Sequence, residues 1–157
     1  MADDSSGSGE PTAATETEAL NGALAAEHTA VWGYGVVGAA LPAGQRGLAA
    51  DAEAAHRDAR DRLMALISER DAEPVDPAGG YELPFPILSE TDAATLAVTL
   101  EDGVAAAYVR VLGDAAESAA RQVAVDALSA TEVRAVGWRT RAKQKPLTNP
   151  FPGLPEG

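Results

Sequence analysis

Two residues that can bind metal or share protons, Glu53 and His56, lie three positions apart in the alanine-rich stretch DAEAAHRDAR. Residues at positions i and i+3 of a helix share one face, so both side chains would point into one space. Carboxylate and imidazole together suit iron or manganese, whereas the thiolates of zinc or iron–sulfur sites are excluded because the chain has no cysteine. The pair predicts either part of a metal site or a polar patch with a partner.

Two further carboxylates lie within the apolar faces of other expected helices. Glu27 falls between Leu24 and Val31, and Glu101 precedes Val104. A buried, unpaired carboxylate costs several kcal/mol, so each of these groups needs a proton, a cation or hydrogen bonds.

A two-metal centre in a helical bundle takes one Glu from each of two helices and a Glu-x-x-His from each of the other two. Glu27, the Glu53–His56 pair and Glu101 supply three of these four parts. The fourth helix supplies no histidine, because the chain has only His28 and His56. The sequence therefore predicts at most a one-metal or vestigial site for iron or manganese, with Glu27, Glu53, His56 and Glu101 as ligands.

An ion-pair network is the alternative, and we favour it over a bound metal. Arg57 follows Glu53 by four residues, which is the favourable orientation for a helical ion pair. Arg60 and Arg134 could neutralise Glu27 or Glu101 across the bundle.

Hydrophobic spacing at three- and four-residue steps predicts the helices that would hold these residues. Prolines and glycines separate them, and the segment from Glu73 to Glu90 has four prolines and two glycines, which exclude a helix. We expect helices over 16–40, about 45–71, from 89 or 91 to 113, and from a cap at Asp114 to about 141. Two helical hairpins joined by a long crossover between helices 2 and 3 define an all-α, ferritin-like four-helix bundle.

The remaining segments are expected to be irregular. Residues 1–15 read as a disordered acidic tail, residues 16–141 as the bundle, and residues 142–157 as an extended, proline-rich tail. We expect Phe151 and Leu154 to hold this C-terminal tail against the bundle. The crossover side chains expected to be partly buried are Tyr81, Leu83, Phe85, Ile87 and Leu88.

Composition narrows the classes of function. A net charge of −12 argues against nucleic acid and anionic membranes as partners. The acidic start is unlike a secretory leader, and no apolar run reaches the roughly 20 residues of a membrane span, so a cytoplasmic protein is expected. No catalytic triad or phosphate-binding loop can be assigned.

Trp32 and Trp138 are expected to pack against the crossover or tail, with a dimer contact as the alternative.

Several phrases together resemble one actinobacterial family, the ferritin-like domain of unknown function DUF4439. They are LAAEHTAVWGYGVVGA, AAHRDARDRL, YELPFP, LAVTLEDGVAAAYV and FPGLPE, in this order from about Ala19 to the C-terminus. The resemblance implies a ferritin-like bundle in an intracellular actinobacterial protein, with no established activity. The metal residues of the broader ferritin-like group transfer only to Glu27, Glu53, His56 and Glu101.

Three functions follow as hypotheses. The first is a non-catalytic or weakly metal-binding bundle that acts through its surfaces and forms a homodimer. The second is an iron- or manganese-dependent redox protein. The third is a small-ligand carrier whose pocket lies between helices beside Tyr34 and Tyr108.

Overall fold

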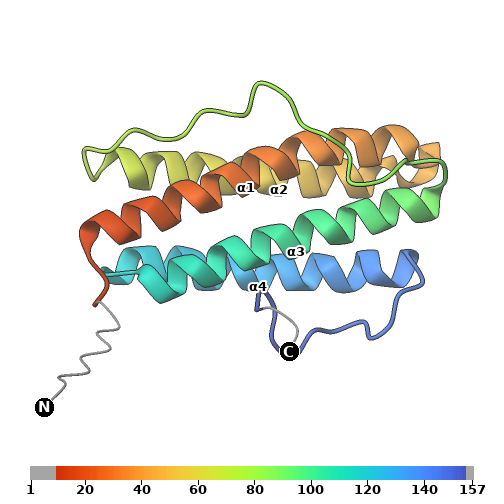
Figure 1. Ribbon diagram of the computed structural model, residues 1–157. Helices are drawn as coiled ribbons and strands as arrows, with labels where there is room; N and C mark the ends of the chain where they lie inside the picture. Colours follow the sequence, from red (N-terminus) through yellow and green to blue (C-terminus); the bar gives the residue numbers. More distant parts are fainter. Residues whose placement is uncertain (1–9, 155–157) are drawn as a thin grey trace, which may run out of the picture.

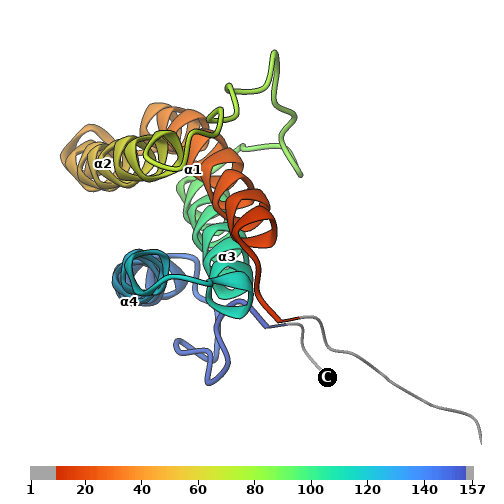
Figure 2. The same cartoon turned by 90° about the vertical axis from the view of Figure 1, so that its left-hand side faces the viewer.

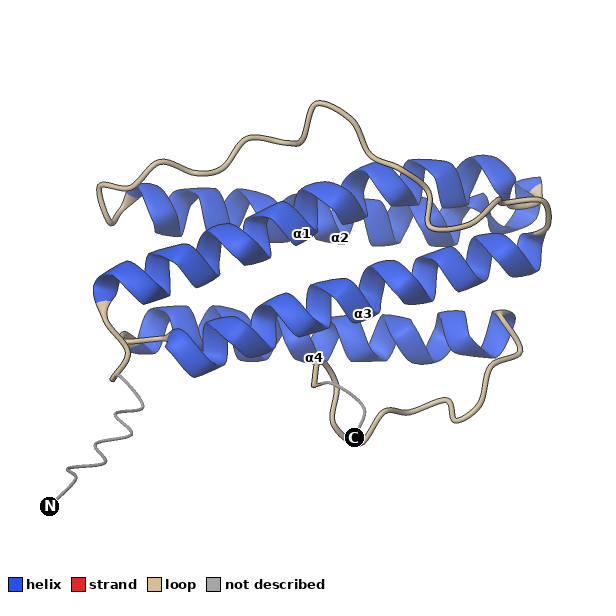
Figure 3. Ribbon diagram, viewed as in Figure 1, coloured by secondary structure: helices blue, strands red, loops and turns tan. Residues whose placement is uncertain are grey.

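The computed structural model describes residues 10–154, which form four α-helices and no strand (Figures 1 and 3). The expected all-α architecture is confirmed. The elements are α1 (Ala13–Ala40), a short 3-10 helix η1 (Ala43–Gln45), α2 (Arg46–Ser68), α3 (Glu90–Asp114) and α4 (Ser118–Arg141).

Helix α1 begins at Ala13, earlier than the expected Glu16, because Thr12 and Thr15 cap it reciprocally. The Thr12 hydroxyl accepts from the Thr15 amide at 3.2 Å, and the Thr12 amide donates to the Thr15 hydroxyl at 2.9 Å. The last residues of the expected disordered tail are thus helical. Residues 1–9 of that tail lie outside the described residues.

The other helix ends differ from expectation at two places. Helix α2 ends at Ser68 rather than near Asp71, which adopts a left-handed conformation with φ of 56°. The expected cap at Asp114 is wrong, because α3 runs through Gly113 to Asp114. Helix α4 begins only after Glu117, whose amide donates to the buried carboxylate of Glu16 at 2.7 Å.

The four helices do not enclose the core equally. Helices α1 and α4 run in one direction and α2 and α3 in the other, and the crossover returns along the whole length of the bundle (Figure 1). Helix α1 packs on α2 and on α3, and α3 packs on α4, but α2 and α4 hardly touch (Figure 2). One side of the bundle is therefore open.

Small side chains bring α1 and α3 close together. A side chain at Gly33 would place its Cβ 2.5 Å from a methyl group of Leu100, so a larger residue there would have to displace the Leu100 side chain. The apolar core forms two clusters, one around Leu24 and Leu63 and one around Tyr34 and Trp138. On α2 and α3, buried polar residues separate the two clusters.

Some contacts of the crossover and the C-terminal tail with the bundle are as expected, and others are not. Trp32 stacks on Tyr81 with ring centroids 5.2 Å apart, which confirms its packing against the crossover. Phe85 and Ile87 pack on the core as expected, but Leu83 and Leu88 are exposed.

The prediction that Phe151 and Leu154 hold the tail is wrong, since both are more than half exposed. Instead, Gly153 lies so close to α3 that a Cβ there would be 2.6 Å from the Ala105 carbonyl oxygen. Arg139 also donates to the Leu147 carbonyl at 3.2 Å. The tail is thus attached by its backbone, which a hydrophobic pattern does not reveal. Within residues 10–154, no helix combines the length and apolar character needed to cross a membrane.

The core makes one stability prediction. Leu24→Ala should lower the free energy of unfolding by about 2–5 kcal/mol, because Leu24 is fully buried and its loss leaves a cavity. Urea unfolding of Leu88→Ala gives the matched control, since Leu88 is 87% exposed and its truncation should change stability by less than about 0.5 kcal/mol. Equal effects of the two substitutions would contradict this packing.

Candidate functional site

A histidine between two carboxylates forms the centre of the polar core. His56 of α2 contacts Glu27 of α1 through Nδ1 at 2.7 Å and Glu101 of α3 through Nε2 at 3.2 Å. All three side chains are 99% or more buried. The sequence-based expectation that these three residues share one interior space is met.

Two tyrosines donate further hydrogen bonds to the same carboxylates. Tyr108 of α3 donates to Glu27 at 2.7 Å, and Tyr34 of α1 donates to Glu101 through a short hydrogen bond. Helices α1 and α3 thus each carry a Glu that is followed seven residues later by a Tyr, and each Tyr donates to the Glu of the other helix. Seven residues are about two helical turns, so in an antiparallel pair each Tyr faces the opposite Glu.

The fourth helix contributes a positive charge. Arg134 of α4 donates through Nε to Glu101 at 2.9 Å and through Nη2 to the Thr131 hydroxyl at 3.2 Å. Its side chain remains 22% exposed. With His56 protonated, an imidazolium and a guanidinium match the two carboxylates, and the network is neutral.

The pKa shifts agree with this charge distribution. Burial lowers the pKa of His56, but its hydrogen bonds to Glu101 and Glu27 outweigh burial and raise that pKa to about 8. Burial opposes ionisation of Glu101, yet His56 and Arg134 hold its pKa below the usual value. Burial and the adjacent carboxylates raise the pKa of Tyr34 and of Tyr108, so both stay protonated donors.

The structure separates Glu53 from the other predicted ligands. Its side chain is 25% exposed and pairs with Arg57, as the i,i+4 spacing predicted. Arg60 pairs with Asp61 at 2.8 Å rather than with a core carboxylate. Among the described residues, no group of three or more His, Asp or Glu side chains is arranged to hold a metal ion.

Within the part of the chain that the structure describes, one oxygen of the network has no hydrogen-bond partner. Oε2 of Glu101 is buried and accepts no hydrogen bond, whereas Oε1 of the same carboxylate accepts from Tyr34, Arg134 and His56 when that imidazole is protonated. A buried carboxylate oxygen without a partner is costly, so it is a position where a bound water or cation would be stabilised.

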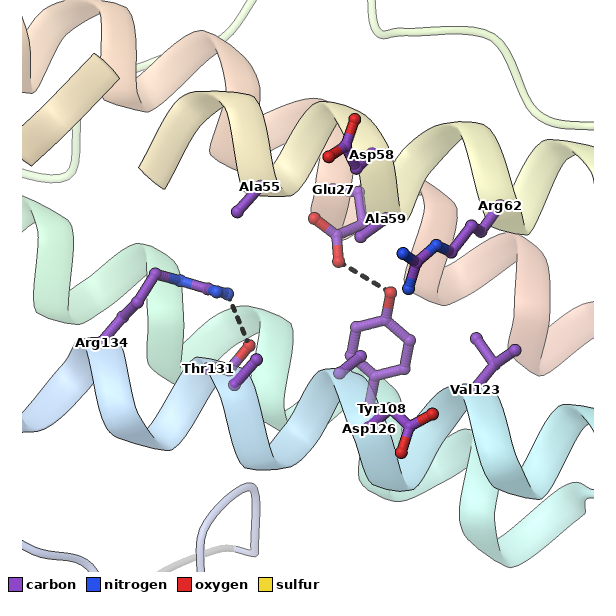
Figure 4. A pocket seen from close by; sticks show the side chains of 12 residues that line it. Glu27, Ala55, Asp58, Ala59, Arg62, Tyr108, Val123, Asp126, Thr131 and Arg134 are labelled. Carbon is purple, nitrogen blue, oxygen red and sulfur yellow. Dashed lines mark hydrogen bonds between the residues drawn. The ribbon is translucent and has the colours of Figure 1, made fainter. Parts of the chain in front are cut away.

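The open side of the bundle leads to this network. Between α2 and α4 lies a pocket of about 230 Å³, with Glu27 and Tyr108 at its base and Arg134 of α4 at its side (Figure 4). Arg62, Asp58 and other residues of α2 and α4 line its walls. A second pocket of about 260 Å³ beside Trp138 also includes Arg134, so the two lie next to each other along one groove.

Fold and site define a four-helix bundle with a neutral carboxylate–histidine–arginine core and one open side. The model of the domain of unknown function DUF4439 matches residues 19–156, and the chain belongs to this family. A similar solved structure is a conserved hypothetical protein, rv2844, from Mycobacterium tuberculosis. It is 37% identical, with a TM-score of 0.79 over 82% of this chain and 98% of that chain. No curated protein matches the chain.

The raised pKa of His56 makes stability depend on pH. The folded value of about 8 lies above the usual value of 6.5, so the imidazolium stabilises the fold. This contribution, roughly 2 kcal/mol, is fully present below about pH 6.5 and is lost as the pH rises through about 8. Urea unfolding between about pH 6 and pH 9 measures this loss of stability. An NMR titration of the imidazole signals measures the pKa of His56, and the variant His28→Gln shows which signal belongs to which histidine. A His56 midpoint at or below about 6.5 would contradict the network.

The pair between Arg134 and Glu101 should be worth more than a surface pair. Arg134→Met should destabilise the fold by about 3 kcal/mol, because it leaves the fully buried Glu101 without its guanidinium. Arg57→Met breaks the exposed pair with Glu53 and should cost about 0.5 kcal/mol or less. Unfolding free energies of both variants test this order. A loss for Arg134→Met no larger than for Arg57→Met would show that Arg134 does not stabilise the core.

Proposed function

We propose that the protein is a ferritin-like bundle that acts by non-catalytic binding, and that its core network is structural rather than a redox centre. The observation that carries this proposal is the guanidinium of Arg134 on Glu101, together with an imidazolium between Glu27 and Glu101. These two groups supply the positive charge that metal ions supply in two-metal bundles.

The donor set of α4 does not fit a two-metal centre. Such a centre takes a Glu and a His at i and i+3 from this helix, and here Thr131 and Arg134 stand at that spacing beside the carboxylates. A guanidinium is a donor only and remains protonated, so Arg134 has no lone pair for a metal. On α2, Glu53 faces Arg57 rather than His56.

His56 would also have to change its protonation state. Both ring nitrogens are engaged by carboxylates, and a pKa of about 8 favours the imidazolium at neutral pH. A metal binds only the neutral ring, so binding must first release a proton. This competition supports a core whose charges are balanced by its own side chains.

The binding role is supported by the groove between α2 and α4. Its two adjacent pockets are the openings through which a molecule could reach the polar core. The homodimer and the cytoplasmic location remain predictions. The tryptophans do not favour a dimer contact, since Trp32 stacks on Tyr81 and Trp138 is only 5% exposed in the single chain.

A single bound metal ion is the second candidate function. Oε2 of Glu101, which is unpartnered among the described residues, supports it, because iron or manganese could take this oxygen. Glu27 and a deprotonated His56 would have to leave their present hydrogen bonds to join it as ligands. In this redox alternative the three residues would be ligands, and Glu53 would lie outside the site.

Metal quantification of the full-length protein, purified without chelator and then incubated with Fe²⁺ or Mn²⁺, decides between the two. We expect metal far below one ion per chain, unchanged in Glu101→Gln. Glu53→Gln is the matched control on the exposed pair. Stoichiometric metal that is lost in Glu101→Gln and retained in Glu53→Gln would overturn the structural role and establish the one-metal site.

A further inference from the structure

We infer that the pocket beside Trp138 binds a small aromatic carboxylate, with the ring between Leu48 and Val133 and the carboxylate between Arg134 and Arg141. This inference rests on the proposed binding function and names its class of ligand. The pocket lies at the end of the groove between α2 and α4 and has a volume of about 260 Å³. It is slightly smaller than the roughly 300–1,000 Å³ of sites for drug-sized molecules, so the ligand is small.

Apolar side chains form most of this pocket. Ala52 of α2 and Gly137 of α4 are small and leave the space open, while Trp138 lies at its base. At the rim, Leu48 and Val133 come from opposite walls and are 39% and 75% exposed. A ligand ring would remove both from water, and burial of apolar area favours binding.

The polar groups of the pocket come mainly from one face of α4. Arg134, Trp138 and Arg141 stand at positions i, i+4 and i+7, which place a cation on each side of the indole. Arg141 lies over the Trp138 ring at 5.9 Å. Within the described residues, Nη1 of Arg134 has no hydrogen-bond partner, and Arg141 makes one bond, to the Gly137 carbonyl at 3.3 Å.

The cationic donors of the lining favour a monoanion. Arg134 and Arg141 line the pocket together with one acid, Asp51, and Glu101 already balances the charge of Arg134. The hydrogen-bond donors of the two guanidinium groups, rather than a net positive charge, would therefore hold the anion. A carboxylate carries a single charge and fits the planar fork of a guanidinium. An ammonium group would meet the two arginines and be repelled. Arg134 keeps its bond to Glu101 through Nε, so the ligand would extend the core network rather than replace it.

The probe for this inference is 2-naphthoate, titrated into the full-length protein by calorimetry, with the two indole N–H signals followed by NMR. We expect saturable one-to-one binding that shifts the indole signal of Trp138 and leaves that of Trp32 unchanged. The neutral 2-naphthamide should bind at least tenfold more weakly, because it cannot pair with the arginines.

Two variants locate the anion. Arg141→Gln should weaken 2-naphthoate binding at least tenfold and leave the pH titration of His56 unchanged, because Arg141 is not part of the core network. Arg57→Gln removes the same charge from α2 outside the pocket and should bind as the unchanged protein does.

No binding of 2-naphthoate, equal binding of 2-naphthamide, or an unaffected Arg141→Gln would overturn the ligand class. Metal content, measured separately, decides the structural role of the core. A protein that contains no metal but prefers 2-naphthylammonium would therefore refute the carboxylate while leaving the proposed binding function intact.

Discussion

Two carboxylates in the middle of the helical bundle are the constraint on which the rest of the structure depends. Each would cost several kcal/mol if buried alone, so the surrounding helices must supply charge and hydrogen bonds. His56 reaches both Glu27 and Glu101, and this requires α2 to approach α1 and α3 at one level of the bundle. The position of one imidazole thus fixes the relative positions of three helices.

Helices α1 and α3 supply further hydrogen bonds to the two carboxylates in a nearly symmetric arrangement. α1 and α3 run antiparallel, each has a Glu and a Tyr seven residues apart, and each Tyr donates to the other helix's Glu. Displacing α1 along α3 by one turn would break both tyrosine bonds at once. The network therefore specifies the register of a contact that small apolar side chains alone would leave loosely defined.

The sequence predicted the four helices, the crossover and the meeting of Glu27, His56 and Glu101, because apolar periodicity and a long proline-rich segment are local signals. Of the two arginines that the sequence offered as partners of Glu27 or Glu101, only Arg134 reaches the core, because Arg60 pairs with Asp61. The outward position of Glu53 was missed, because an i,i+3 spacing places two residues about 60° apart and Arg57 was the nearer partner. Tyr34 and Tyr108 were missed as donors, although the repeated Glu-x6-Tyr spacing was visible in the chain. The open side could not be predicted, since no local pattern reports which helix pairs fail to touch.

Arg134 connects the polar core with the open side. An arginine side chain is long, so α4 can deliver a charge to Glu101 while its backbone stays apart from α2. A two-metal centre makes the opposite demand, because short Glu and His side chains from all four helices must converge on the ions. Replacing ions by a guanidinium therefore removes the need for α2 and α4 to close together. The groove and the charge-neutral core are then two consequences of the same residue, and the proposed binding role of the groove is consistent with a core whose charges are balanced by its own side chains.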